Sequence, residues 1–444
     1  MNNRKIIFLV IIGAIILIIS IVLLLLTKSD KKNISKSSGN FKIWIVGDSK
    51  IKFEEFMSSF KLANKSMSNV EFDVKSFSNY EDYNLALNSA FIKGVSPDIF
   101  ILNNNEISLF EEKVYALSNI KIDIHKFRQD YNTVFIDDLI VTTGEGEEKK
   151  EFLKGIPIGY ETLGILYNAR FRLKRSDFNQ TYSLDSAIRK IKGFDVIPLG
   201  MGNGSSVVYA GDLLAQQFLL NSISSIEDSD NIKSKAVLAE YMEYGSEEGD
   251  NAYNSLYAKS KVSGKNNIDF FAENQVGAII TYPRVIEQLK TYGFSSRFLY
   301  AAPYPHRTTG DGPTLANYNY FVINSDSEQK IIALAFMNYI NSDLGSEEYL
   351  SKYKYYLPAK RNLEDKLGER KISSYFPNIQ LRDFYSDEPL SSFNKGNKVI
   401  YDKEIQNVLD NFGSYLDTFD SFKNSILCKT DKILELKNLS ISCE

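Results

Sequence analysis

Residues 155–171 read GIPIGYETLGILYNARF. It is apolar enough for a buried strand, yet Pro157 removes a ladder donor and three glycines loosen the backbone around it. Tyr160 and Glu161 place a polar pair in its middle. A strand with these interruptions is predicted to bend and to pass from one domain into another.

The size of the chain agrees with two domains. Its 444 residues are too many for one ordinary core and suit two units of roughly 200 residues each. The hydrophobic fraction of 43% and the aromatic fraction of 13% are typical of a globular protein. The net charge of −4 is spread along the chain, which leaves no basic footprint for nucleic acid.

The N-terminus carries a long apolar run. Residues 6–26 read IIFLVIIGAIILIISIVLLLL and contain no charge. A helix of this length spans the roughly 30 Å hydrocarbon core at about 1.5 Å per residue. No cleavage site and no lipid-accepting cysteine follow. We expect a retained membrane anchor over residues 1–27 and a polar, lysine-rich tether over 28–40. Lysines flank both ends of the run, so charge alone does not orient it.

From residue 41 the pattern alternates between strands and amphipathic helices. FKIWIVG (41–47), VEFDVKSF (70–77) and PDIFIL (97–102) are predicted strands, and helical apolar stripes lie between them. This order predicts a parallel sheet with right-handed crossovers, hence an α/β fold. Ligands of such sheets lie beyond the carboxyl ends of the strands. The side chains expected there are Asp48, Asn103, Asn104 and Asn105.

The sequence after residue 168 predicts a second mixed region. Residues 181–191 and 207–220 have helical periods, whereas 194–200 and 276–283 are predicted strands. The segment from residue 400 onward is helical in period and rich in charge.

Motifs for catalysis are largely missing. The two histidines lie far apart, no nucleotide or zinc-protease motif occurs, and both cysteines stand near the C-terminus. We therefore expect no enzyme activity, no metal site and no cofactor. A pair of carboxylates could still hydrolyse a glycoside, so a membrane-tethered glycoside hydrolase remains an alternative.

A glycine-rich segment, GMGNGSS at 200–206, separates a predicted strand from a predicted helix. Ser205 stands where the dinucleotide fingerprint needs its third glycine. The segment either presents backbone amides to a polar ligand or forms a plain structural turn.

These motifs, taken in order, resemble the family 1 extracellular solute-binding proteins, which are the receptors of ABC transporters. The resemblance covers about residues 41–365 and rests most on SPDIFIL and GIPIGYETLGILYN; YLPAKRNL (356–363) continues it. The chain departs from the family in its transmembrane span, in Thr181-Tyr182 for Thr-Trp, and in Asn274-Gln275 for Gly-Lys.

The resemblance implies a two-lobed, periplasmic-binding-protein-like fold of type II with hinge crossovers. Residues 41–158 and 325–360 would form the N-lobe, and residues 159–324 and 361–444 the C-lobe with a helical C-terminal tail. The lobes would close over a ligand. The stretch at 155–168 would be the first crossover.

The resemblance also implies a function. The protein would capture a solute, expected to be a neutral carbohydrate, outside the cytoplasm and deliver it to an ABC permease, as a single-pass protein of the cell membrane. A sensory or adhesion role without transport is the other alternative. The ligand-binding residues implied by the family's cleft are Asp48, Asn103, Asn104, Asn105, Tyr160, Glu161, Asn203, Tyr282, Arg284, Tyr318 and Tyr320.

Cys428 and Cys443 are candidates for a disulfide, because an extracytoplasmic setting permits oxidation.

Overall fold

The structure is a computed structural model, and it describes most of the chain between residues 40 and 410. The described residues are 40–105, 110–144, 148–178, 189–191, 194–202, 204–227, 231–243, 263–306, 312–385, 389–395, 398–410 and Cys428.

A six-stranded sheet forms the centre of the N-lobe. Its order is β14-β7-β13-β3-β1-β2, with β1 parallel to both β2 and β3, as the alternating pattern predicts. β13 runs antiparallel to β3 and β7. Almost every residue of β3 and β7 is buried, because helices cover both faces of the sheet. The strands are β1 (Phe41–Val46), β2 (Phe72–Phe77), β3 (Ile99–Asn103), β7 (Ile156–Glu161), β13 (Asn317–Ile323) and β14 (Leu357–Pro358).

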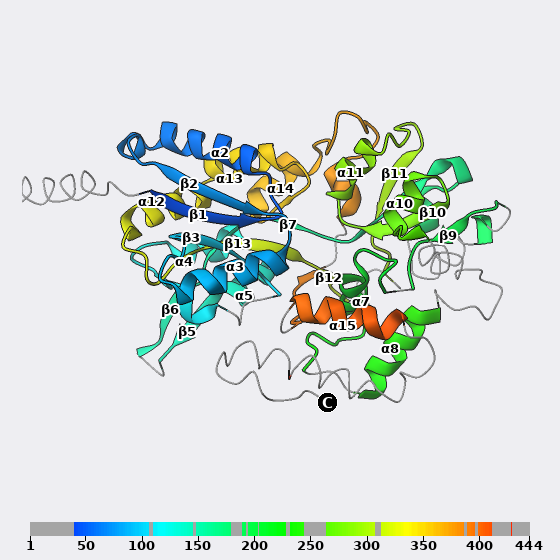
Figure 1. Cartoon of the computed structure of the whole chain (residues 1–444), viewed down its shortest axis with the longest axis horizontal. Coiled ribbons are helices and arrows are strands. Elements are labelled where there is room, and N and C mark those ends of the chain that lie inside the picture. Colours follow the sequence, from blue (N-terminus) through cyan, green and yellow to red (C-terminus); the bar gives the residue numbers. More distant parts are fainter. Residues whose placement is uncertain are drawn as a thin grey trace, which may run out of the picture.

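Helices cover this sheet in two layers (Figure 1). The apolar stripe predicted for the first helix is confirmed, since Phe53, Phe56, Met57 and Phe60 are its buried residues. α2, α12 and α13 pack together on one side, and α3 lies on the other. The N-lobe helices are α2 (Lys50–Ala63), α3 (Tyr80–Ile92), α4 (Ile124–Asp130), α5 (Thr133–Leu139), α12 (Lys330–Asn341), α13 (Asp343–Lys352) and α14 (Arg361–Gly368).

The C-lobe contains a four-stranded sheet of order β11-β8-β10-β9. The strands are β8 (Gly164–Asn168), β9 (Ile197–Leu199), β10 (Val276–Thr281) and β11 (Leu299–Pro303). α7 and α15 pack against each other beside it (Figure 1). The C-lobe helices are α7 (Ala210–Leu220), α8 (Asn231–Glu243), α10 (Asn267–Ala272), α11 (Val285–Thr291) and α15 (Lys398–Asp410).

Two small sheets complete the described structure. β12 (Thr314–Leu315) pairs with β15 (Leu390–Ser391), and β4 (Leu117–Ser118), β6 (Lys150–Leu153) and β5 (Ile140–Thr143) form an antiparallel sheet.

The stretch at 155–168 joins the two large sheets. β7 ends at Glu161 in the N-lobe sheet, and β8 begins at Gly164 in the C-lobe sheet, so that two residues make the crossover. A Cβ on Gly155 would lie 2.4 Å from the carbonyl oxygen of Phe321, which explains the glycine by the close approach of β13.

Pro157 is accommodated at an irregularity of the sheet. It faces Tyr320 of β13, directly beside a register shift between Tyr318 and Tyr320. A proline cannot donate to the ladder, and sheets accept it at such bulges. Asn319 lies between these two positions of β13, pairs with Asn103 of β3 on the other side, and lies in the wall of the pocket described below.

The sheets place two segments differently from the expected lobe boundaries. The expected boundaries place residues 317–323 in the C-lobe, whereas β13 pairs with β3 and β7 in the N-lobe sheet. They also place residues 361–368 in the C-lobe, whereas α14 packs against β14 of the N-lobe. In both cases the chain crosses between lobes at a position that apolar periodicity does not mark.

The expected anchor (1–27), the tether (28–40, apart from Asn40) and the tail beyond Asp410, apart from Cys428, lie outside the described residues. Within the described part of the chain, no helix is both long and apolar enough to cross a membrane. Cys443 is not described either, so its disulfide with Cys428 stays a prediction.

Candidate functional site

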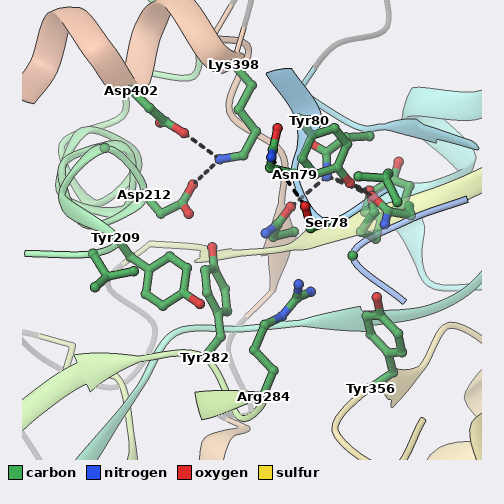
Figure 2. A pocket seen from close by; sticks show the side chains of 18 of the residues that line it. Ser78, Asn79, Tyr80, Tyr209, Asp212, Tyr282, Arg284, Tyr356, Lys398 and Asp402 are labelled. Atoms are coloured by element: carbon green, nitrogen blue, oxygen red, sulfur yellow. Dashed lines mark hydrogen bonds and ion pairs between the residues drawn. The ribbon is translucent and has the colours of Figure 1, made fainter. Parts of the chain in front are cut away.

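A cavity of about 230 Å³ lies between the lobes, and residues from both line it (Figure 2). Its walls come from the ends of N-lobe strands and, in the C-lobe, from α7, α15 and the residues between β10 and α11. The lining residues are Val46, Gly47, Ser78, Asn79, Tyr80, Asn103, Val208, Tyr209, Gly211, Asp212, Tyr282, Arg284, Asn317, Tyr318, Asn319, Tyr356, Lys398, Asp402 and Gln406.

The N-lobe wall is a network of amides. Asn103, at the carboxyl end of β3, donates to the side-chain oxygens of Asn317 at 2.9 Å and Asn319 at 3.1 Å. The Asn319 oxygen also accepts a hydrogen bond from Tyr80. Asn79 holds Tyr80 in place because it caps α3, accepting from the backbone N–H of Asp82 at 2.8 Å. These groups can donate to and accept from ligand hydroxyls.

Tyrosines and an arginine form the facing C-lobe wall. The ring of Tyr282 stands edge-on to that of Tyr209 with centroids 4.9 Å apart. The Tyr282 hydroxyl is buried and has no hydrogen-bond partner among the described residues. Burial raises the pKa of Tyr209 to about 12 and that of Tyr282 well above its ordinary value, so both hydroxyls stay protonated. A buried hydroxyl without a partner is costly unless a ligand or water satisfies it.

Arg284 connects the two lobes. It stands at the N-cap of α11, and its guanidinium binds the carboxylate of Glu161, which ends β7 and is fully buried. Burial raises the pKa of Glu161 although Arg284 opposes this effect. The guanidinium also lies over the rings of Tyr355 and Tyr356, at 5.6 and 5.8 Å. The pair is therefore a structural bridge at the crossover, with its arginine facing the cavity.

Four charged residues lie together where α7 meets α15, and we call them the charge quartet: Asp212, Lys395, Lys398 and Asp402. All but Lys395 line the cavity. Lys395 is fully buried, binds Asp212 and lies 3.2 Å from Asp402. Lys398 lies 3.5 Å from Asp212 and 2.8 Å from Asp402, between the two carboxylates (Figure 2). Burial alone would raise the pKa of Asp212, but the two lysines outweigh it and hold this pKa below its ordinary value.

Of the residues predicted for the site, the cavity brings together Asn103, Tyr282, Arg284 and Tyr318, with Glu161 directly behind Arg284. Tyr318 lines the cavity, but its hydroxyl donates to Asp138 at 2.6 Å and not to the cavity.

Asp48 does not line the cavity. Its carboxylate accepts hydrogen bonds from Tyr349, from Tyr355 at 3.0 Å and from Tyr356 at 3.3 Å. Burial raises its pKa in spite of these hydrogen bonds. Nor does Asp48 cap α2, whose N-cap is Ser49. Asp48 instead links the end of β1 to α13 and to the residues that follow it.

Four other predicted residues also lie outside the cavity wall. Asn104 hydrogen-bonds the backbone of Ala316, between β12 and β13, at 2.9 Å and that of Tyr318 in β13 at 3.1 Å. Tyr160 packs on Phe135 and donates to Glu364 at 3.4 Å. Asn105 and Tyr320 are buried and are absent from the lining. Asn203 lies outside the described residues.

Several residues that line the cavity are not among those predicted from the sequence. Ser78 and Asn79 follow β2, so the strand-end argument that selected Asn103 could have found them. Asp212, Lys398 and Asp402 gave no such signal, because helical acids and lysines usually lie on a solvated face. One alternative for the glycine-rich loop was that its backbone amides bind a polar ligand, and the structure shows another partner for two of them. The amides of Gly204 and Ser205 donate to Asp410 of α15 at 3.0 Å.

A family model described as bacterial extracellular solute-binding protein matches residues 56–373. The chain therefore belongs to the bacterial extracellular solute-binding proteins, as the sequence resemblance indicated. No curated protein matches the sequence.

Solved structures share the fold. An ABC substrate-binding protein from Listeria monocytogenes, solved with cycloalternan, has a TM-score of 0.60 at 13% identity, over 89% of this chain and 98% of that one. A solute-binding protein from Thermotoga lettingae, bound to α-D-tagatose, gives 0.61 at 14% identity, over 90% and 100%. The sugar-binding protein MalE from Xanthomonas citri gives 0.60 at 15% identity, over 90% and 98%.

Proposed function

We propose that this protein captures a neutral carbohydrate between its lobes and delivers it to an ABC permease. Residues 6–26 would anchor it in the cell membrane with the lobes outside the cytoplasm. The observation that carries the proposal is the composition of the cavity between the lobes. Tyrosine rings stand there beside amides, and the two cations among the described lining residues, Arg284 and Lys398, both have anionic partners.

This composition matches the chemistry of a sugar. Sugar rings present C–H faces to aromatic rings, and their hydroxyls both donate and accept hydrogen bonds. Tyr209 and Tyr282 supply rings, while Asn103, Asn317 and Asn319 supply amides. An amino acid would instead need a cation and an anion that are available to it. Here Arg284 is bound to Glu161, and Lys398 to Asp402.

The same charges argue against a glycoside hydrolase. A hydrolytic pair needs one carboxylic acid that is protonated near neutral pH, hence a raised pKa. The carboxylates that line the cavity are Asp212 and Asp402, both bound by lysines, and the pKa of Asp212 is lowered.

A thermal-shift screen of the full-length protein in detergent tests the proposal. The panel contains neutral mono- and disaccharides, amino acids and short peptides. We expect a neutral saccharide to raise Tm, because a ligand that binds only the folded state adds about 2.7 kcal/mol at a hundred times its Kd.

Tyr282→Ala should weaken that saccharide's binding, measured by calorimetry, without loss of the unliganded fold. Tyr375→Ala, at an exposed position, is the control and should bind as the wild type does. A response to an amino acid or a peptide alone would contradict the carbohydrate proposal.

A further inference from the structure

One face of the C-terminal helix α15 forms a wall of the cavity. Lys398, Asp402 and Gln406 follow one another at intervals of four residues, which places them on one side of the helix, and all three line the cavity. The residues buried on the rest of the helix are Tyr401, Ile405, Val408 and Leu409. α15 is thus fixed by an apolar face while its polar face meets the ligand space.

Contacts at both ends of α15 set its position. At its C-terminal end, Asp410 accepts from the amides of Gly204 and Ser205 at 3.0 Å. A Cβ on Gly204 would lie 2.4 Å from the carbonyl oxygen of Gln406, so the loop and the helix are in backbone contact. At the other end, Lys395 and Lys398 bind Asp212 of α7. A wall held in this way is rigid enough to select a ligand.

The quartet is electrically balanced and only partly shielded. It contains two carboxylates and two ammonium groups. The side chains of Lys398 and Asp402 are 13% and 32% exposed to solvent, whereas those of Lys395 and Asp212 are 0% and 3% exposed. A carboxylate has about four acceptor sites, so Asp402 can accept from ligand hydroxyls while it binds both lysines. The residues matched to the family end at 373, which leaves the whole of α15 outside that match.

We propose that α15 is a specificity determinant of this protein: Lys398 and Asp402 hydrogen-bond the hydroxyls of a neutral sugar and reject its charged derivatives. This inference rests on the proposed capture of carbohydrate. A uronate or an ammonium group entering the cavity would meet a like charge of the quartet and would lose water without gaining a free counter-charge. Repulsion of this kind is a common source of specificity.

The proposal fixes the direction in which single substitutions change selectivity. Asp402→Asn leaves the quartet with an excess positive charge, which should favour anionic sugars. Lys398→Gln leaves an excess negative charge, which should favour cationic ones. Lys398→Arg keeps the balance and should keep the wild-type preference.

The experiment uses matched sugars and the full-length protein in detergent. Glucose, glucuronate and glucosamine form one triplet, and galactose, galacturonate and galactosamine another; Kd is measured by calorimetry at low salt. We expect the wild type to bind the neutral member best. In Asp402→Asn the discrimination against the uronate should shrink about tenfold, and in Lys398→Gln the discrimination against the amino sugar should shrink about tenfold. Lys366→Gln, which breaks an exposed ion pair with Glu347, is the control.

The outcomes separate this inference from the function on which it rests. Two charge variants that keep the wild-type selectivity would overturn the role of α15 and leave the proposed function intact. A wild type that prefers a charged member would overturn the role of α15 and the neutral ligand, but not carbohydrate capture itself. A wild type that binds no saccharide would refute the proposed function, and the inference with it.

Discussion

Asp212 and Lys395 are the most deeply buried oppositely charged pair of the quartet. The Lys395 side chain is 0% exposed and the Asp212 side chain 3% exposed, so water screens their mutual attraction only weakly. Lys395 has a second anion, Asp402, at 3.2 Å. A buried pair of this kind adds little net stability over an apolar pair. Removal of one partner, however, leaves the other charge buried without a counter-charge.

Asp212→Asn is therefore expected to lower the free energy of unfolding at pH 7 by about 3 kcal/mol. The double variant Asp212→Asn with Lys395→Met should lose less than the two single losses added together. Urea denaturation gives the values, with Glu347→Gln in an exposed pair as the control. An unchanged stability of Asp212→Asn would contradict the assigned burial of Lys395.

The same carboxylate sets a pH dependence. Its folded-state pKa lies below its ordinary value of 3.8, so below that pH the unfolded chain binds the proton more readily. The stability that Asp212 contributes is present above about pH 4 and is lost as the pH falls further. Asp212→Asn should therefore lose stability less steeply than the wild type between pH 4 and pH 2, again measured by urea denaturation. Equal slopes would argue against the lowered pKa.

At the scale of elements, the strand ends show how far sequence reasoning reaches. Asn103 was found because the carboxyl end of a parallel strand is marked by its own local pattern. Asp48 follows a parallel strand in the same way, yet three tyrosines about 300 residues away donate hydrogen bonds to its carboxylate. Local periodicity locates a strand end, but the partner that meets it there depends on tertiary contacts.

The strands and helices of the lobes were largely predictable, because buried faces impose a period on the sequence. The polar face of α15 was not, since its charges have the spacing of a solvated helix and only its packing against α7 buries them. The lobe boundaries were misplaced for a related reason. β13 alternates asparagine and tyrosine before a buried apolar end, and nothing within it shows which sheet it joins.

Gly204→Ala tests how α15 is positioned. The added Cβ would meet the backbone of Gln406, which cannot move aside as a flexible side chain could. The helix must shift, and we expect a loss of about 1–3 kcal/mol in the free energy of unfolding together with weaker ligand binding. Gly368→Ala, which meets nothing within 4 Å, is the matched control and should not destabilise the protein. Wild-type stability and binding in Gly204→Ala would contradict the close contact.

In the molecule as a whole, the pair Glu161–Arg284 joins the two lobes. Glu161 belongs to the N-lobe sheet and Arg284 to the C-lobe, and the two meet beside the two-residue crossover. Because the crossover itself is short, a single strong contact next to it can restrain rotation of one lobe against the other.

Arg284→Gln removes that restraint. We expect the ligand-free protein to populate a wider opening, seen as a larger radius of gyration in small-angle X-ray scattering. The free energy of unfolding should fall by about 3 kcal/mol, because Glu161 stays buried without its partner. Arg382→Gln, in an exposed pair with Glu369, should change neither quantity. An unchanged radius of gyration for Arg284→Gln would refute the restraint.

The position of α15 in the chain has a consequence for biosynthesis. The N-lobe strands through β13 leave the ribosome seconds before residues 398–410 do, at about 5–20 residues per second. Both lobes can then begin to fold while the α15 wall is still being synthesised. A chain that stops before residue 398 would present two lobes with an open, one-sided cleft, and the proposed solute affinity would require synthesis as far as α15.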